Sequence, residues 1–302
     1  MNDEVAAPYG TGPAKTTTPV KRVRTHHLRQ FKEGGERFSM LTAYDQYTAA
    51  TFDEAGIDVL LVGDSAANNV YGYETTVPIS VDELLPLTRA VSRSVHRALV
   101  VGDLPFLSYQ VSPTDAVANA GRLIKEGAAE AVKLEGGCAV AEAIERIAAV
   151  DIPVMGHIGL TPQSVHRMGG HKVQGRRRGQ APGQRERLID DALAVEAAGA
   201  FAIVLEGIPL DLAAELTARL TIPTIGIGAG VHCDGQILVL HDVLGLCERT
   251  APRFAKRYAD LWSAAQEAIG GYAREVRERA FPTPGHSFQS LATVPVKEPV
   301  SA

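Results

Sequence analysis

The chain has 302 residues, of which 45% are hydrophobic and 22% charged, a composition that excludes a largely disordered protein. Its formal net charge of −5 argues against a nucleic-acid partner, and no apolar run approaches the roughly 18 residues of a membrane span. The three cysteines lack disulfide or zinc spacing, so we expect a cytoplasmic protein without membrane contact.

Polar tails flank the part of the chain in which regular structure is expected. Residues 1–24 are rich in Pro, Gly and Thr, which predicts a disordered tail that leads into a short helix near 25–33. Residues 282–302 are again polar and interrupted by proline, which predicts a second tail. We therefore expect one domain over residues 25–281.

Short apolar segments recur through this domain. They are rich in Val, Ile and Leu on both faces, as strands buried on both sides should be. The predicted strands are residues 39–43, 59–63, 98–102, 131–134, 153–156, 201–205, 223–227 and 237–240. Helical patterns separate most of them: Ser80 and Glu83 predict a capping box, and Ser112 precedes a proline at the first position of another helix.

This alternation predicts a single (β/α)₈ TIM barrel with a short N-terminal helix. A weak internal repeat supports it, because Gly56, Gly127 and Gly199 each precede an apolar strand that is followed by a carboxylate. We expect these glycines to be left-handed residues at helix ends. One feature fits poorly, since residues 228–236 are fewer than the dozen or so that a parallel crossover usually needs. Either that helix is a single turn or the eighth predicted strand is wrong.

In such a barrel the carboxyl ends of all strands open on one face, which holds the active site. The residues at the predicted strand ends are Tyr44 and Asp45, Asp64 and Ser65, Asp103, Glu135, His157 and Glu206. A single acidic residue at a strand end is most often a helix cap. Several carboxylates that converge on one mouth repel one another, and a divalent cation removes this penalty. Oxygen ligands favour Mg²⁺ over zinc, so the pattern indicates a magnesium site.

Two basic residues near these ends allow alternatives. Lys133 lies two residues before Glu135 and therefore on the same side of the strand. It either holds a substrate carboxylate or forms an internal ion pair with one of the acids. His157 either donates a hydrogen bond to substrate or fixes the loop at Thr161; its place at the mouth favours the first role.

Three other features point less clearly to function. The glycine-rich run Gly226–Gly230 either cradles a phosphate or, as we favour, allows close backbone packing. Arg176–Arg178 form a basic run that is typical of a solvated surface, although a lid or a subunit contact is an alternative. Cys138 is expected in a core or capping role.

A set of collinear motifs from about residue 25 to residue 288 resembles the ketopantoate hydroxymethyltransferase family. The segments that carry the resemblance are Leu41–Asp45, Val62–Ser65, Asp103–Phe106, Val132–Gly137, His157–Gln163, Lys172–Gly175, Gly226–Gly230 and His286–Phe288. The resemblance implies a (β/α)₈ barrel that assembles as a homodecamer. It also implies transfer of a hydroxymethyl group from 5,10-methylenetetrahydrofolate to 3-methyl-2-oxobutanoate, through a Mg²⁺-stabilised enolate, to give 2-dehydropantoate for pantothenate biosynthesis.

Matching the motifs residue by residue implies roles for individual side chains. The implied Mg²⁺ ligands are Asp64, Asp103 and Glu135. The implied contacts to the 2-oxo acid are Asp64, Ser65, Asp103 and Lys133, to which we add His157. Glu206 is the implied proton acceptor.

Two departures and two competing hypotheses accompany the resemblance. The stretch from Arg177 to Gly183 replaces a shorter acidic link, and Gly207 stands where a bulkier residue is expected beside the base. A barrel of the phosphoenolpyruvate mutase and isocitrate lyase group would also place acids around Mg²⁺, but the chain lacks a Lys-Lys-Cys-Gly-His loop. A non-enzymatic oligomer on a barrel scaffold would require the acidic cluster at the mouth to be accidental.

Overall fold

The computed structural model describes residues 21–176, 183–248 and 251–288. The chain divides into two compact units, Met1–Leu240 and His241–Ala302. All eight strands lie in the first unit, and the domain limits expected above remain predictions.

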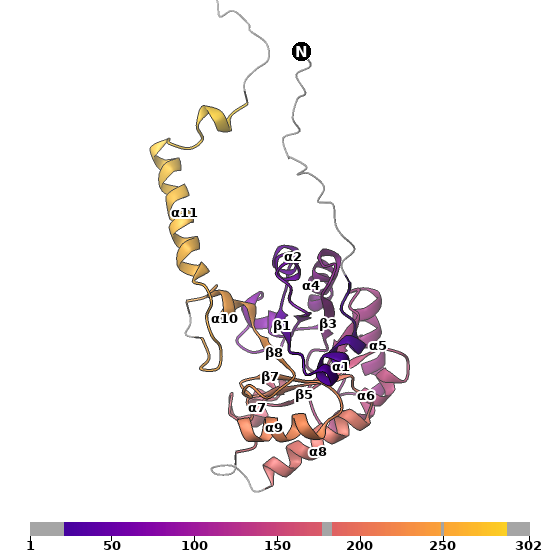
Figure 1. Cartoon of the computed structure of the whole chain (residues 1–302). Helices are drawn as coiled ribbons and strands as arrows, with labels where there is room; N and C mark the ends of the chain where they lie inside the picture. Colours follow the sequence, from indigo (N-terminus) through magenta and orange to yellow (C-terminus); the bar gives the residue numbers. More distant parts are fainter. Residues whose placement is uncertain (1–20, 177–182, 249–250, 289–302) are drawn as a thin grey trace, which may run out of the picture. The chain divides into compact units, whose positions relative to one another are not determined.

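The strands of the first unit form one closed parallel barrel in the order β1 to β8, with β8 paired to β1. Figure 1 labels β1, β3, β5, β7 and β8 of this barrel. The strands are β1 Phe38–Thr42, β2 Val59–Val62, β3 Leu99–Asp103, β4 Ala131–Lys133, β5 Val154–Gly159, β6 Ala202–Glu206, β7 Thr224–Ile227 and β8 Gly235–Leu238. The predicted TIM barrel is therefore confirmed, and each predicted strand overlaps an observed one.

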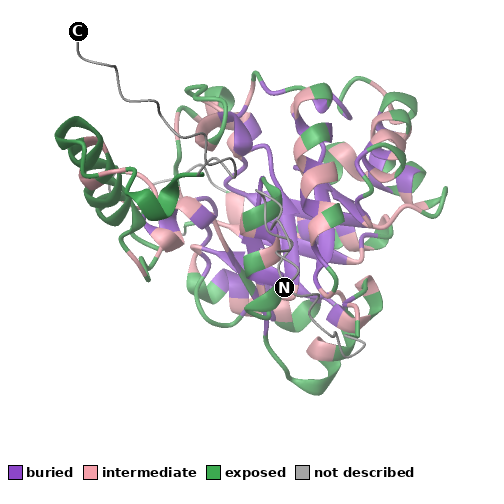
Figure 2. Cartoon of the chain, turned by 90° about the horizontal axis from the view of Figure 1, so that it is seen from above, coloured by how far each residue is buried: buried purple, intermediate pink, exposed green. Residues whose placement is uncertain are grey.

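The helices of the first unit surround this barrel. The longer ones are α1 Thr25–Gly34, α2 Gln46–Glu54, α4 Val81–Ser94, α5 Pro113–Lys125, α6 Ala141–Ala148, α8 Gln184–Ala197 and α9 Leu210–Arg219. The short ones are α3 Ala66–Asn69, α7 Val165–Met168, and the 3₁₀ turns η1 Cys138–Val140 and η2 Pro162–Ser164. The Ser80–Glu83 capping box and the Ser112 cap are both present. Buried residues occupy the strands and the inner helix faces, whereas the outer faces are exposed (Figure 2).

Alternate residues of each strand point into the barrel. This alternation determines which strand-end residues face the site. Val101, Ala131, Met155 and Val204 belong to the apolar cluster that fills the barrel interior. Their strand neighbours, among them Val132, Leu205 and Ile203, belong instead to the cluster between strands and helices. Because side chains alternate along a strand, the residue two positions after each interior residue also faces inward.

The N-terminal helix α1 packs at the opposite end of the barrel from the carboxyl ends of the strands. Its buried Leu28 belongs to the interior cluster together with Phe38, the first residue of β1. Lys32 Nζ lies 2.9 Å from Asp234 Oδ2, just before β8 begins. Hydrophobic packing and a nearly buried ion pair therefore fix α1 at the end of the barrel that TIM barrels use for stability.

Two sequence expectations about the fold are corrected. The connection from β7 to β8 contains a turn at Val231 and His232 but no helix, so the eighth strand is real and the expected crossover helix is absent. Gly127 does not have a left-handed backbone, whereas Gly56 and Gly199 do. The left-handed residue is Ala128, and a Cβ on Gly127 would lie 2.6 Å from the Leu123 oxygen. Gly127 is thus required for close packing rather than for its φ angle.

The second unit contains α10 Leu240–Leu244, which begins at the end of the first unit, α11 Leu261–Glu278 and η3 Pro284–His286. No helix in the described part of the chain is both long and apolar enough to cross a membrane.

Candidate active site

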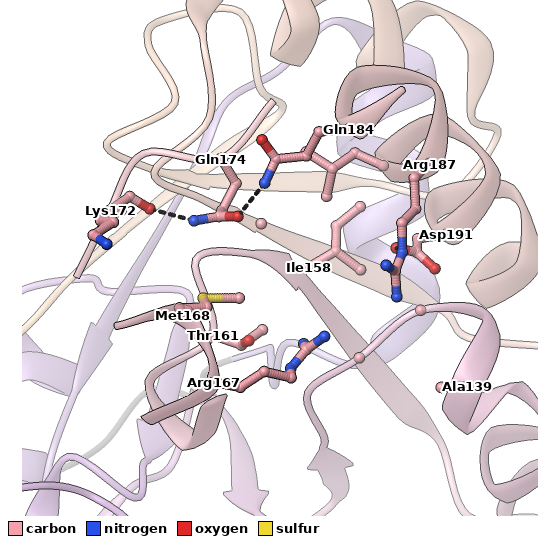
Figure 3. A pocket seen from close by; sticks show the side chains of 14 residues that line it. Ala139, Ile158, Thr161, Arg167, Met168, Lys172, Gln174, Gln184, Arg187 and Asp191 are labelled. Carbon is pink, nitrogen blue, oxygen red and sulfur yellow. Dashed lines mark hydrogen bonds and ion pairs between the residues drawn. The ribbon is translucent and has the colours of Figure 1, made fainter. Parts of the chain in front are cut away.

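In the described part of the chain, two of the cavities lie at the carboxyl ends of the strands. The larger, of about 460 Å³, lies over β5 and beside α8, and its lining includes Ile158, Gln174 and Gln184 (Figure 3). The smaller, of about 100 Å³, is lined by every site residue that the sequence predicted. The chemistry therefore concentrates in the smaller cavity.

The inward register of four strands builds this smaller cavity. Asp103 follows Val101 by two positions, and Lys133 and Glu135 continue from Ala131 on β4. His157 follows Met155 on β5, and Glu206 follows Val204 on β6 in the same way. The polar residues thus form the last inward layer above apolar layers, which is where TIM barrels place catalytic groups.

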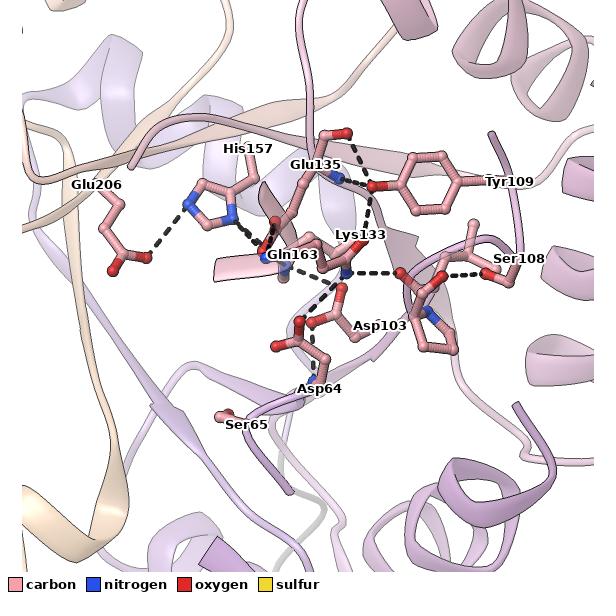
Figure 4. A network of polar contacts seen from close by, with 12 residues as sticks. Asp64, Ser65, Asp103, Ser108, Tyr109, Lys133, Glu135, His157, Gln163 and Glu206 are labelled. Carbon is pink, nitrogen blue, oxygen red and sulfur yellow. Dashed lines mark hydrogen bonds and ion pairs between the residues drawn. The ribbon is translucent and has the colours of Figure 1, made fainter. Parts of the chain in front are cut away.

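One ammonium group lies among three buried carboxylates. Lys133 Nζ is 2.8 Å from Asp103 Oδ1 and 3.9 Å from Glu135 Oε1. The backbone N–H of Asp64 donates to Asp103 Oδ2 at 3.0 Å, which brings the third carboxylate alongside (Figure 4). The internal ion pair considered for Lys133 is therefore present. The three acids and one lysine leave this cluster short of positive charge.

The pKa values follow from this imbalance. Burial and the neighbouring charges of Asp103 and Glu135 raise the pKa of Asp64 well above its usual value. Burial also raises the pKa of Asp103, although Lys133 opposes the effect. Burial would lower the pKa of Lys133, but the surrounding carboxylates outweigh it and raise the pKa. Lys133 therefore remains charged. Its single positive charge does not balance the negative charges that the three carboxylates would carry.

His157 connects the carboxylate cluster to Glu206. Its Nδ1 lies 3.3 Å from Glu135 Oε1 and its Nε2 lies 3.3 Å from Glu206 Oε2. Burial and Lys133 lower the pKa of His157, but the contacts with Glu135 and Glu206 prevail and raise it to about 9. The same contact with His157 lowers the pKa of Glu135 against the effect of burial. A protonated imidazole thus lies between the two carboxylates at neutral pH and contacts both of them.

Glu206 differs from the other acids in its access to solvent. Its side chain is 16% exposed, whereas those of Glu135 and Asp103 are 3% and 0% exposed. The described contacts join Glu206 to His157 and not to Lys133. Glu206 is therefore the carboxylate with room to accept a proton from a ligand in the cavity.

The first strand end behaves differently from the others. Asp45 caps α2 by accepting from Tyr47 N at 2.8 Å and Thr48 N at 3.0 Å, so it lies outside the cluster. Tyr44 is buried, and its hydroxyl lies 2.8 Å from Ser65 Oγ. Ser65 lines the smaller cavity beside Asp64, as the sequence predicted.

Two residues that the sequence analysis did not assign fix the carboxylates in place. Gln163 Nε2 donates to Asp64 Oδ2 at 3.2 Å, and Gln163 N donates to Glu135 Oε2 at 3.0 Å. The Tyr109 hydroxyl donates either to Gln163 Oε1 or to the Glu135 carbonyl oxygen, each at 2.8 Å. Gln163 belongs to the motif that begins at His157, so the sequence could have indicated that Gln163 lies near the site. Tyr109 stands in a loop with no such pattern.

The buried carboxylates offer oxygen atoms that could bind a metal ion. Within the described residues, no three His, Cys, Asp or Glu side chains are already arranged as a metal cage. However, Asp103 Oδ1 and Glu135 Oε1 are buried without a well-formed hydrogen bond and are held by charge contacts only. Mg²⁺ usually takes one or two carboxylates and completes its shell with water and substrate oxygens. The residues therefore fit a hard divalent cation that is shared with an oxygen-rich ligand.

The remaining sequence features have structural roles or fall outside the description. A Cβ on Gly230 would lie 2.1 Å from Leu210 Cδ1, in agreement with close packing of the glycine-rich run. Cys138 is exposed, so the core role expected for it is wrong; its backbone N donates to Asp191 Oδ1 at 2.8 Å at the start of η1. Arg176 is exposed, and Arg177 and Arg178 lie outside the described residues.

Comparison with known sequences identifies close relatives. The family model for ketopantoate hydroxymethyltransferase matches residues 22–284. A 3-methyl-2-oxobutanoate hydroxymethyltransferase from Nocardioides sp. is 56% identical over 294 residues, which cover 95% of this chain and 98% of the relative. The enzyme of the same name from Geobacter sulfurreducens is 57% identical over 261 residues, covering 86% and 96%.

Solved structures with a similar fold are more distant. Phosphonopyruvate hydrolase in complex with oxalate and Mg²⁺ has a TM-score of 0.56 at 14% identity, covering 87% of this chain and 93% of the other. A 2,3-dimethylmalate lyase of the PEP mutase/isocitrate lyase superfamily has a TM-score of 0.54 at 15% identity, covering 86% and 92%. At these identities the likeness supports the barrel fold alone.

Proposed function

The chain belongs to the ketopantoate hydroxymethyltransferase family, and we propose on this basis that its smaller cavity removes the C3 proton of a 2-oxo acid beside a Mg²⁺ ion. It is an enzyme, a 3-methyl-2-oxobutanoate hydroxymethyltransferase of pantothenate biosynthesis. The co-substrate is 5,10-methylenetetrahydrofolate, which supplies the one-carbon unit.

The observation that carries this mechanism is the shortage of positive charge around three buried carboxylates. Asp64, Asp103 and Glu135 would hold Mg²⁺, with Lys133 as the only ammonium within contact distance among the described residues. When bound, Mg²⁺ supplies positive charge where the keto oxygen becomes negative as the C3 proton leaves.

The chain's own residues perform the remaining tasks. Lys133 contacts Asp103 and lines the cavity, and it would hold an outer carboxylate oxygen of the 2-oxo acid. Ser65 and His157 line the same cavity and would orient the acid by hydrogen bonds. A cavity of about 100 Å³ suits a small acid and excludes most water.

Glu206 would accept the C3 proton. Its carboxylate lines the cavity and contacts protonated His157, which orients it. The resulting carbanion would then attack the one-carbon unit of the folate, forming the new C–C bond as one C–N bond to the folate breaks. Water would supply the hydroxyl group as the second C–N bond breaks, and the proton held by Glu206 would return to the departing tetrahydrofolate nitrogen. We further propose, from family membership, a homodecameric assembly and a cytoplasmic location.

The test separates proton removal from hydroxymethyl transfer. Glu206→Gln should bind Mg²⁺ and 3-methyl-2-oxobutanoate but lose deuterium exchange at C3, measured by NMR without folate. Asp45→Asn is the matched control, because it removes a carboxylate from the same mouth while asparagine still caps α2. Exchange at the normal rate in Glu206→Gln would remove this residue from the role of base.

A further inference from the structure

The larger cavity at the mouth of the barrel is basic, although the chain as a whole is acidic. Three cationic side chains, of Arg167, Lys172 and Arg187, line it, against one carboxylate, Asp191. All three cations are exposed at the cavity rim. The whole chain carries a formal net charge of −5, so this local excess of positive charge runs against its average.

Two of these cations lack an ionic partner. Within the described residues, neither Arg167 nor Lys172 forms an ion pair or a side-chain hydrogen bond, and only the backbone oxygen of Lys172 accepts one, from Gln174 Nε2. Arg187 Nε lies 4.0 Å from Asp191 Oδ2, but that carboxylate also accepts from Cys138 N at 2.8 Å. The cavity therefore presents at least two uncompensated positive charges to an anionic ligand.

The floor of the cavity is apolar. Ile158 and Leu188 are buried there, and Met168 and Ala139 add further apolar surface (Figure 3). Its polar wall is fixed internally, because Gln184 Nε2 donates to Gln174 Oε1. An apolar floor with a cationic rim fits a ligand that has a flat apolar body and terminal carboxylates.

The two cavities share walls. Gly136 and Gly137 line the larger cavity directly after Glu135, which lines the smaller one. In the same way Ile158 and Gly159 follow His157, and Gly159 pairs with Glu206 across β5 and β6. A molecule that extends from the larger cavity therefore needs to pass only the carboxyl end of a strand to reach Glu206, the proposed base.

The proposed reaction needs two substrates, and the smaller cavity cannot hold both. Its volume of about 100 Å³ accommodates a small acid, whereas 460 Å³ is within the roughly 300–1,000 Å³ of typical small-molecule sites. Resting on the proposed function, we propose that the larger cavity binds the benzoylglutamate end of the reduced folate. Arg167 and Lys172 hold the glutamate carboxylates, and the benzoyl ring lies against Ile158 and Leu188.

The test compares two ligands that differ only in the group concerned. Tetrahydrofolate carries the glutamate, and tetrahydropteroate lacks it. Calorimetry with the Mg²⁺-loaded full chain should show that the unaltered protein binds tetrahydrofolate more tightly, by about two- to fivefold for each exposed cation engaged. The double variant Arg167→Gln/Lys172→Gln should lose this preference while its affinity for tetrahydropteroate stays the same.

The control is Arg146→Gln, which removes an exposed arginine at the end of α6, toward the opposite end of the barrel. A retained preference in the double variant, an equal loss for both ligands, or the same loss in Arg146→Gln would overturn the assignment. Metal-dependent C3 exchange needs no folate and should be unchanged in the double variant. Absence of this exchange in the unaltered protein would instead count against the proposed function on which the assignment rests.

Discussion

Replacing Lys133 by methionine tests whether its ammonium group is what allows three carboxylates to lie together in the barrel. Lys133 is 3% exposed, and its Nζ lies 2.8 Å from Asp103 Oδ1. Methionine preserves much of the side-chain volume but leaves Asp64, Asp103 and Glu135 without their shared cation. Removing one member of a buried ion pair costs about 3–5 kcal/mol, because the other charge is left uncompensated.

The pH and the metal should both change the loss of stability caused by Lys133→Met. Burial and mutual repulsion already raise the pKa values of Asp64 and Asp103, so protonation can partly replace the lost ammonium in acid. We therefore expect the full loss of stability near pH 8 and a smaller one near pH 5. Mg²⁺ should stabilise Lys133→Met more than the unaltered protein, because the cation relieves a larger charge imbalance.

The assay is urea unfolding with EDTA or with Mg²⁺, which gives the free energy of unfolding for each state. Lys125→Met is the control, because Lys125 is exposed near the end of α5 and should change stability by about 0.5 kcal/mol or less. Equal stability of Lys133→Met and Lys125→Met in EDTA near pH 8 would show that the burial of the three carboxylates does not require the ammonium group of Lys133.

Three further predictions concern single side chains. Asp103→Asn should abolish metal-dependent turnover and the stabilisation by Mg²⁺, and a normal Mg²⁺ titration would refute the ligand assignment. His157 has a folded pKa of about 9 against an ordinary 6.5, so it stabilises the metal-free protein fully below pH 6.5 and loses this effect as the pH rises through 9. The difference in unfolding free energy between the unaltered protein and His157→Gln in EDTA, about 3 kcal/mol near pH 6, should therefore shrink above pH 9; a constant difference would contradict the pKa. Tyr109→Phe removes the hydroxyl that holds Gln163 and the Glu135 backbone, and should weaken Mg²⁺ binding about tenfold in calorimetry, whereas unchanged binding would exclude a positioning role.

The barrel was predictable from the sequence because its strands are buried on both faces. Continuous runs of Val, Ile and Leu are the mark of such strands, and all eight were located. Their limits were less accurate where glycine is part of the strand. β5 continues through Gly156 to Gly159, beyond the predicted end at 156, because the strand accepts glycine where Val195 packs closely on it.

The strand-end residues were predictable for a similar reason, since topology alone brings them together. The same prediction was wrong for Asp45. Asp45 differs from Asp64 in the structure of the residues that follow it. A helix begins directly after Asp45, and its carboxylate caps that helix. Local sequence does not distinguish a cap from a ligand when both follow a strand.

Side chains from long loops could not be predicted. Tyr109 reaches the site from the connection between β3 and α5, and its contact with Gln163 joins residues 54 positions apart. Gly207, the unexpected small residue after the base, has a φ of +56° and donates its backbone N–H to the Ile227 oxygen. Glycine here serves the left-handed turn that ends β6.

The charge balance of the mouth links stability, metal and substrate in one argument. Three acids and one lysine are buried on apolar layers, so bulk water cannot compensate their charge. A 2-oxo acid brings one further negative charge and would be repelled by this cluster in its metal-free form. A divalent cation makes that interaction attractive. It neutralises the excess negative charge of the carboxylates and offers free coordination sites to the carboxylate and keto oxygens of the acid. Binding of the acid should therefore depend on the cation, while Lys133 and His157 supply the positive charge that keeps the barrel folded until the cation arrives.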